Sequence, residues 1–101
     1  MPTAKDKVLC QTPSKGKSAK NIPQWKYDLL RAAIRKVVPK NKEGVEFSKL
    51  FDLVKREVSA DDRAKLGSLP WYTTTVKLHL EVIGELERVP DSKPQRLRRV
   101  K

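Results

Sequence analysis

The chain has few of the residues from which catalytic and metal sites are most often built. Its 101 residues include one cysteine, Cys10, and one histidine, His79, and aromatic residues make up only 6%. A lone cysteine cannot form an intrachain disulfide, and a structural zinc site needs several Cys or His ligands at characteristic spacings. We therefore expect no disulfide, no metal ion and no cofactor.

Long apolar runs are also missing. A membrane-spanning helix needs about 18 or more predominantly apolar residues in a row, and no stretch of this sequence approaches that length. The first twenty residues lack the apolar segment of a secretion signal. These absences predict a cytoplasmic protein with no membrane role, and a reducing compartment suits its single cysteine.

No arrangement of residues indicates catalysis. His79 falls on the apolar side of a predicted helix, where a histidine is usually a packed or rim residue. Residues 16–18, Gly-Lys-Ser, resemble the end of a phosphate-binding loop, but the glycine required five positions earlier is Gln11. The adjacent acids Asp61 and Asp62 suit the first turn of a helix. We expect that the protein is not an enzyme.

Positive charge is what the chain has in excess. Lys and Arg number 23 against 12 Asp and Glu, for a net charge of +11. Residues 1–22 and 91–101 each carry +4, whereas the longer central part, 23–90, carries only +3. Basic ends on a near-neutral centre suit a domain that binds a polyanion. Solvated tails without a binding role have the same composition, so both interpretations stay open here.

The length allows one small domain. Residues 11–20 have no apolar period, and we expect 1–22 to form a flexible basic arm in which Val8, Leu9 and Cys10 could add a short strand. The single folded domain would then span residues 23–101.

Apolar spacing and helix punctuation predict four helices within this domain. Pro39 ends the first helix, Ser59 with Asp62 resembles a capping box at the start of the third, and Pro70 and Gly84 bracket the last. The helices span about 24–38, 47–58, 60–66 and 70–83. Short runs at about 86–89 and 95–100, separated by a polar loop with two prolines, predict a β-hairpin. The fold class is mainly α, of the α+β type.

The last helix carries the most informative pattern. On a helical wheel, Tyr72, Val76, Leu80 and Ile83 share one side, and Thr73, Thr74, Lys77 and Glu81 lie opposite. We expect the first set to face the core and the second to face solvent. Three further apolar residues, at the edge of the apolar side, could form an exposed stripe: Trp71, Leu78 and Val82.

The order helix, short strand, helix, short helix, helix, strand, basic turn and strand resembles the winged helix-turn-helix domains of bacterial transcription regulators. Residues 80–89, Leu-Glu-Val-Ile-Gly-Glu-Leu-Glu-Arg-Val, carry most of this resemblance, since in that family a helix ends at Gly and an Arg- or Lys-bearing hairpin, the wing, follows. The whole chain also resembles a group of small uncharacterised bacterial winged-helix proteins, most distinctively at residues 70–75, Pro-Trp-Tyr-Thr-Thr-Thr. The resemblance covers about residues 23–100. It implies three main helices, a short helix and a C-terminal wing.

The same resemblance implies DNA binding and transcription regulation. The candidate contacts are Thr73, Thr74 and Lys77 on the last helix, and Lys93, Arg96, Arg98 and Arg99 on the wing. The helix face lacks the Arg, Asn or Gln that read bases with two hydrogen bonds, so we expect weak sequence specificity or none. Such a protein would be associated with the nucleoid.

Other interpretations compete with DNA binding. The threonines could simply begin a helix, and the wing arginines could lie on a solvated strand face. A winged helix could instead dimerise or dock another protein through Trp71, Leu78 and Val82. RNA binding by the basic ends comes third, because RNA-binding proteins usually expose aromatic side chains for base stacking.

Overall fold

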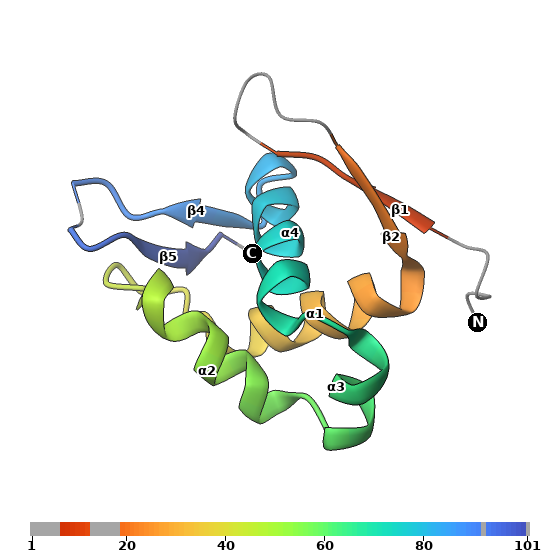
Figure 1. Cartoon of the computed structure of the whole chain (residues 1–101). Coiled ribbons are helices and arrows are strands. Elements are labelled where there is room, and N and C mark those ends of the chain that lie inside the picture. The colour runs from red at the N-terminus through yellow and green to blue at the C-terminus, as the bar shows by residue number, and fades with distance from the viewer. Residues whose placement is uncertain (1–6, 13–18, 92, 101) are drawn as a thin grey trace.

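The computed structural model describes residues 7–12, 19–91 and 93–100. Within these residues the chain is a small α+β protein with four helices and two small antiparallel sheets (Figure 1). Its elements are β1 (Lys7–Cys10), β2 (Lys20–Pro23), α1 (Gln24–Val37), β3 (Val45–Glu46), α2 (Phe47–Glu57), α3 (Ala60–Leu66), α4 (Leu69–Val82), β4 (Leu86–Arg88) and β5 (Arg96–Arg99). The four expected helices and the two expected C-terminal strands differ from these bounds by at most one residue at each end.

Local sequence signals explain the helix ends. Val38 adopts an extended conformation before Pro39, so α1 stops there. The Ser59 hydroxyl accepts a hydrogen bond from the Asp62 backbone N–H at 3.1 Å and caps α3. The Ser68 hydroxyl caps α4 in the same way, through the Trp71 backbone N–H at 3.3 Å. Each cap satisfies an amide that the helix itself leaves without a partner.

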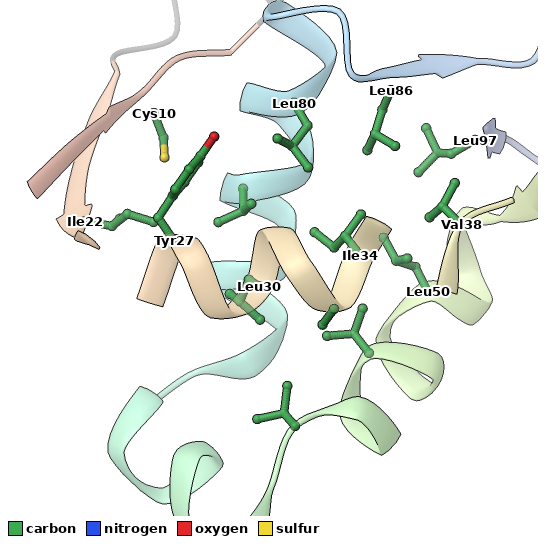
Figure 2. Packing of buried hydrophobic residues seen from close by; sticks show 14 of the residues in the cluster. Cys10, Ile22, Tyr27, Leu30, Ile34, Val38, Leu50, Leu80, Leu86 and Leu97 are labelled. Carbon is green, nitrogen blue, oxygen red and sulfur yellow. The ribbon is translucent and has the colours of Figure 1, made fainter. Parts of the chain in front are cut away.

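The C-terminal strands form a three-stranded sheet with β5 in the middle. The strand order is β3-β5-β4, and both neighbours run antiparallel to β5. Leu97 lies opposite Val45 of β3 and Arg88 of β4. Leu86 and Leu97 are buried and turn this sheet toward the core. Figure 2 shows these two leucines near Val38 and Leu50.

The second sheet corrects the expectation of a flexible N-terminal arm. β1 and β2 pair as an antiparallel ribbon, and Cys10 and Ile22 are buried in the common core. Figure 2 shows both side chains beside Tyr27 of α1. An isolated two-stranded ribbon is marginal in water, so packing against helices is what makes this one stable. The rest of the expected arm, residues 1–6 and 13–18, lies outside the described residues.

Helix α4 is the element around which the others pack. It contacts α1, α2, α3, β1 and β4, and in Figure 1 it runs through the centre of the molecule. Val76 and Leu80 of α4 are buried in the same cluster as Leu30 and Ile34 of α1. A helix covered on several sides must bury more than one narrow stripe of its surface.

Just beyond α4, a cluster of charges ties the chain to α1. Arg31 donates two hydrogen bonds of 3.0 Å and one of 3.3 Å to the Glu85 carboxylate, and Arg35 donates another at 2.8 Å. Partial burial acts to raise the pKa of Glu85, but the hydrogen bonds and charges of the two arginines outweigh it and hold this pKa below its ordinary value.

The contact of Gly44 with β5 gives the first prediction. Gly44 has φ +62°, and a Cβ placed there would lie 2.0 Å from the backbone oxygen of Leu97. We expect Gly44→Ala to lower the free energy of unfolding by about 2 kcal/mol or more, because both the backbone and β5 must shift. Gly84→Ala is the matched control, since Gly84 has φ +81° but nothing within 4 Å of the added carbon. Urea denaturation should show a smaller loss for Gly84→Ala, of about 1 kcal/mol. Equal losses would contradict a role for the Leu97 contact.

The Glu85 cluster gives the second prediction. A carboxyl group with a lowered pKa contributes stability above its unfolded-state pKa, and this contribution disappears as the pH falls through the folded-state value. We expect Glu85→Gln to cost about 1–2 kcal/mol near neutral pH, a modest figure because solvent screens Arg31. The difference between wild type and variant should shrink on acidification. Denaturant melts across the acidic range measure this, and a constant difference would contradict the charge argument.

Candidate functional site

The structure corrects the expected orientation of α4 in part: Val76 and Leu80 face the core as expected, but Ile83 is 43% exposed. Thr73 and Lys77, predicted to face solvent, have relative exposures of 0% and 2%. The Lys77 ammonium lies 2.9 Å from Oε2 of Glu81 and 4.4 Å from the centre of the Phe47 ring. The expectation that Thr73 and Lys77 are exposed is therefore wrong. In this structure neither side chain can reach a DNA groove.

The charges around Lys77 explain how a lysine is accommodated there. Burial is the largest influence on the pKa of Lys77 and lowers it, whereas the hydrogen bond and charge of Glu81 act in the opposite direction. The other carboxylate oxygen of Glu81 accepts a hydrogen bond from Arg88 at 2.7 Å. A buried ion pair of this kind is tolerated when its partners are well placed. A helical wheel cannot predict the burial of Lys77, because that burial depends on Phe47 and Arg88, which belong to other elements.

The wing arginines are used within the fold. Arg98 pairs with Glu87 across the β4–β5 ladder. Arg96 donates to the backbone oxygen of Glu43 at 2.7 Å, and Arg99 donates to that of Val38 at 2.8 Å. These contacts fasten β5 to β4 and to the segment before β3. Lys93, the fourth expected wing contact, is exposed and has no ion pair among the described residues.

The outward side of α4 is apolar. Trp71 and Val82 have relative exposures of 45% and 39%, and Leu78 is half-buried between them. Their spacing places them along one side of the helix. These are the three residues expected as an alternative partner surface, and we call them the α4 stripe.

A groove of about 600 Å³ adjoins the α4 stripe. It lies between the first part of α4 and the ends of β1 and β2 that are nearest to it. Its lining combines apolar groups with hydroxyls and one lysine: Cys10, Gln11, Thr12, Lys20, Ser68, Pro70, Trp71, Thr74, Thr75 and Leu78. Thr74, an expected DNA contact, is therefore part of this groove. Burial raises the pKa of the Cys10 thiol to about 11, so it stays neutral and acts as an apolar wall.

Hydrogen bonds hold both walls of the groove in place. The Gln11 backbone N–H donates to Nδ1 of His79 at 3.0 Å and joins the end of β1 to α4. The Lys26 ammonium of α1 donates to the Leu66 backbone oxygen at 2.9 Å and to the Tyr72 hydroxyl at 3.1 Å. The start of α4 is thereby fixed to α1. The sequence analysis missed the wall at Cys10–Thr12, because no local signal shows that this short strand packs on α4.

In the part of the chain that the structure describes, no three or more His, Cys, Asp or Glu side chains gather in a way that could hold a metal ion. No helix in the described part is both long and apolar enough to cross a membrane.

The buried pair on α4 gives the third prediction. Glu81→Gln leaves the Lys77 ammonium buried without its counter-charge, and we expect a loss of about 3 kcal/mol in the free energy of unfolding. Glu87→Gln breaks a more exposed pair with Arg98 and should cost less than about 1 kcal/mol. Urea denaturation of both variants makes the comparison. Similar small losses would mean that Glu81 does not compensate a buried charge on Lys77.

Sequence comparison adds the family of the chain. Residues 7–97 match the model of a family described as a family of unknown function, DUF6958. No curated protein and no solved structure matches the chain. The matched range begins at Lys7, the first residue of β1, and so includes the N-terminal ribbon as well as the helices and the second sheet. The chain therefore belongs to the family DUF6958.

Proposed function

We propose that the protein is a small winged-helix module that binds another protein through α4. One observation carries the proposal: α4 presents Trp71, Leu78 and Val82 outward and buries Thr73 and Lys77. Exposed large apolar residues such as Trp71 and Val82 are typical of protein interfaces. A DNA-reading helix needs the opposite arrangement, with polar and basic side chains outward.

The winged-helix part of the proposal is supported by topology. α1, α2 and α4 pack together, and β5 lies between β3 and β4 in an antiparallel sheet. The β4–β5 hairpin directly follows α4 in the chain. These features support the layout that the sequence resemblance implies, and β1 and β2 precede them in the chain.

Charge indicates the chemistry of the partner. The chain carries a net charge of +11, so two copies repel each other and an acidic partner is attracted. Lys20 lies at the groove and offers a contact for a carboxylate. The partner is therefore an acidic segment rather than a second copy of this chain.

The shape of the surface indicates the form of that segment. From Trp71 to Val82 the stripe rises about 16 Å along α4, at 1.5 Å per residue. This length matches three turns of a second helix laid against the stripe. The groove beside Trp71 can receive one large apolar side chain. The proposed ligand is an acidic amphipathic helix with an aromatic or leucine anchor.

DNA binding with little sequence specificity is the second candidate. One observation favours it: Lys40, Lys42 and Lys93 are exposed and have no ion pairs among the described residues. The hydrogen bond from Arg96 to Glu43 holds the loop containing Lys40 and Lys42 beside β5. These lysines could contact phosphates without reading bases.

Peptide selection tests the proposal and gives the fourth prediction. A display library of random linear peptides is panned against the full chain, and selected peptides are labelled for fluorescence anisotropy. We expect enrichment of Asp and Glu together with Trp, Phe or Leu at helical spacing. Trp71→Ala should weaken binding by at least about tenfold, since a central aromatic anchor dominates such interfaces. Trp25→Ala is the matched control, because Trp25 lies on α1 outside the groove lining.

Two results would overturn the proposal. Selected peptides could bind the Trp71→Ala variant as well as wild type, or no peptide could be enriched while a mixed-sequence DNA duplex binds. In the second case, replacing Lys40, Lys42 and Lys93 by Ala should make the slope of log affinity against log salt shallower by about 2.7. That outcome would favour the DNA candidate.

A further inference from the structure

We infer that His79 is the positioning residue of the groove. Its neutral imidazole holds the wall formed by residues 10–12, which we call the β1 wall, against α4, and protonation releases that wall. The consequence for ligand binding rests on the proposed function. The positioning role itself concerns the folded chain alone, and it can be tested without a ligand.

The hydrogen bond between β1 and α4 carries the inference. The Gln11 backbone N–H donates to Nδ1 of His79 at 3.0 Å, across 68 positions of sequence. Gln11 follows Cys10 directly, and both line the groove together with Thr12. On the facing wall lie Thr75 and Leu78 of α4. This hydrogen bond therefore joins the two walls directly at the groove, where Gln11 follows the buried Cys10.

Only one form of His79 can make the contact. An imidazole nitrogen accepts a hydrogen bond when it carries no proton, so Nδ1 must be bare and the ring proton must sit on Nε2. In the imidazolium both nitrogens are donors. Nδ1–H would then face the Gln11 N–H, and two donors cannot form a hydrogen bond.

The surroundings of His79 favour the neutral form. From α1, Tyr27 meets the imidazole edge to face, with ring centres 5.6 Å apart. Burial lowers the pKa of His79, and the negative charge of Glu85 opposes this shift only in part. Arg31 and Arg35 of α1 already pair with Glu85. From β1, the thiol of Cys10 stays neutral up to high pH.

The pH range follows from the sign of this shift. A histidine whose folded-state pKa is lowered contributes stability that is complete above its unfolded value of about 6.5 and is lost as the pH falls below it. The β1 wall is therefore held at neutral pH and released as the pH falls through the lowered folded-state pKa of His79. On the proposed function, the groove loses its ligand over the same range.

An NMR titration of the isotope-labelled full chain tests the positioning role and gives the fifth prediction. The Gln11 amide proton should move upfield with the same midpoint as the His79 ring signals. Its protection against hydrogen exchange, relative to an unstructured amide at the same pH, should fall at least about tenfold. If the His79 ring titrates and the Gln11 amide does not respond, the inference is wrong.

Two variants separate titration from packing. In His79→Asn, Oδ1 stands as many bonds from Cα as Nδ1 does, and it accepts a hydrogen bond without titrating. The Gln11 amide should then stay protected across the range. His79→Phe keeps a ring against Tyr27 but removes the acceptor, so the amide should be unprotected at every pH. A wild-type pH response in the Asn variant would assign the effect to another group.

Binding of a selected acidic peptide distinguishes this inference from the proposed function. Affinity should fall about tenfold between neutral pH and a pH below the folded-state pKa of His79 in wild type and stay constant in His79→Asn. Peptide binding with the same pH profile in both proteins would overturn the inference and leave the proposed function standing. If the Gln11 amide titrates together with His79 but the protein binds no peptide, the inference stands and the proposed function is wrong.

Discussion

The contacts that Lys77 and Glu81 make with other elements help to determine which side of α4 faces solvent. Both side chains are enclosed, the ammonium lies over the Phe47 ring, and Arg88 adds a second cation to the carboxylate. Rotating α4 to expose Lys77 would take the ammonium away from the Phe47 ring and the Glu81 carboxylate away from Arg88, and would move the buried Leu80 toward solvent. Because burial of apolar side chains stabilises the fold, these contacts together select one rotation of the helix.

The rotation of α4 turns other side chains outward than Thr73 and Lys77, which the sequence analysis expected to contact DNA. The polar side of the helix is used in the core, and three wing arginines are used in joining β5 to its neighbours. A large positive net charge therefore coexists with a central helix whose outward side is apolar. Fold and net charge allow several functions, and the side chains at the surface decide among them.

The proposed groove depends on two parts of the chain that are far apart in sequence. One wall comes from β1 and the start of β2, and the other comes from α4. His79 joins the walls through a single hydrogen bond to the Gln11 amide. The shape of a groove between two elements changes when the contact between those elements changes, whereas a surface on one helix keeps its shape. This is why a single imidazole can influence the whole groove.

The sequence by itself determined the features that depend on neighbouring residues. Pro39, Ser59 and Ser68 end or begin helices through their own backbone and side-chain bonds, and the α+β class and helix bounds follow from such local effects. Only the tertiary structure decided the rotation of α4 and the packing of Cys10 and Ile22. The apolar residues of α4 lie on most sides of the helix, so the hydropathy pattern of α4 does not by itself specify which face is buried. The choice depends on Phe47, Arg88 and the β1–β2 ribbon, whose positions are set by packing between distant segments.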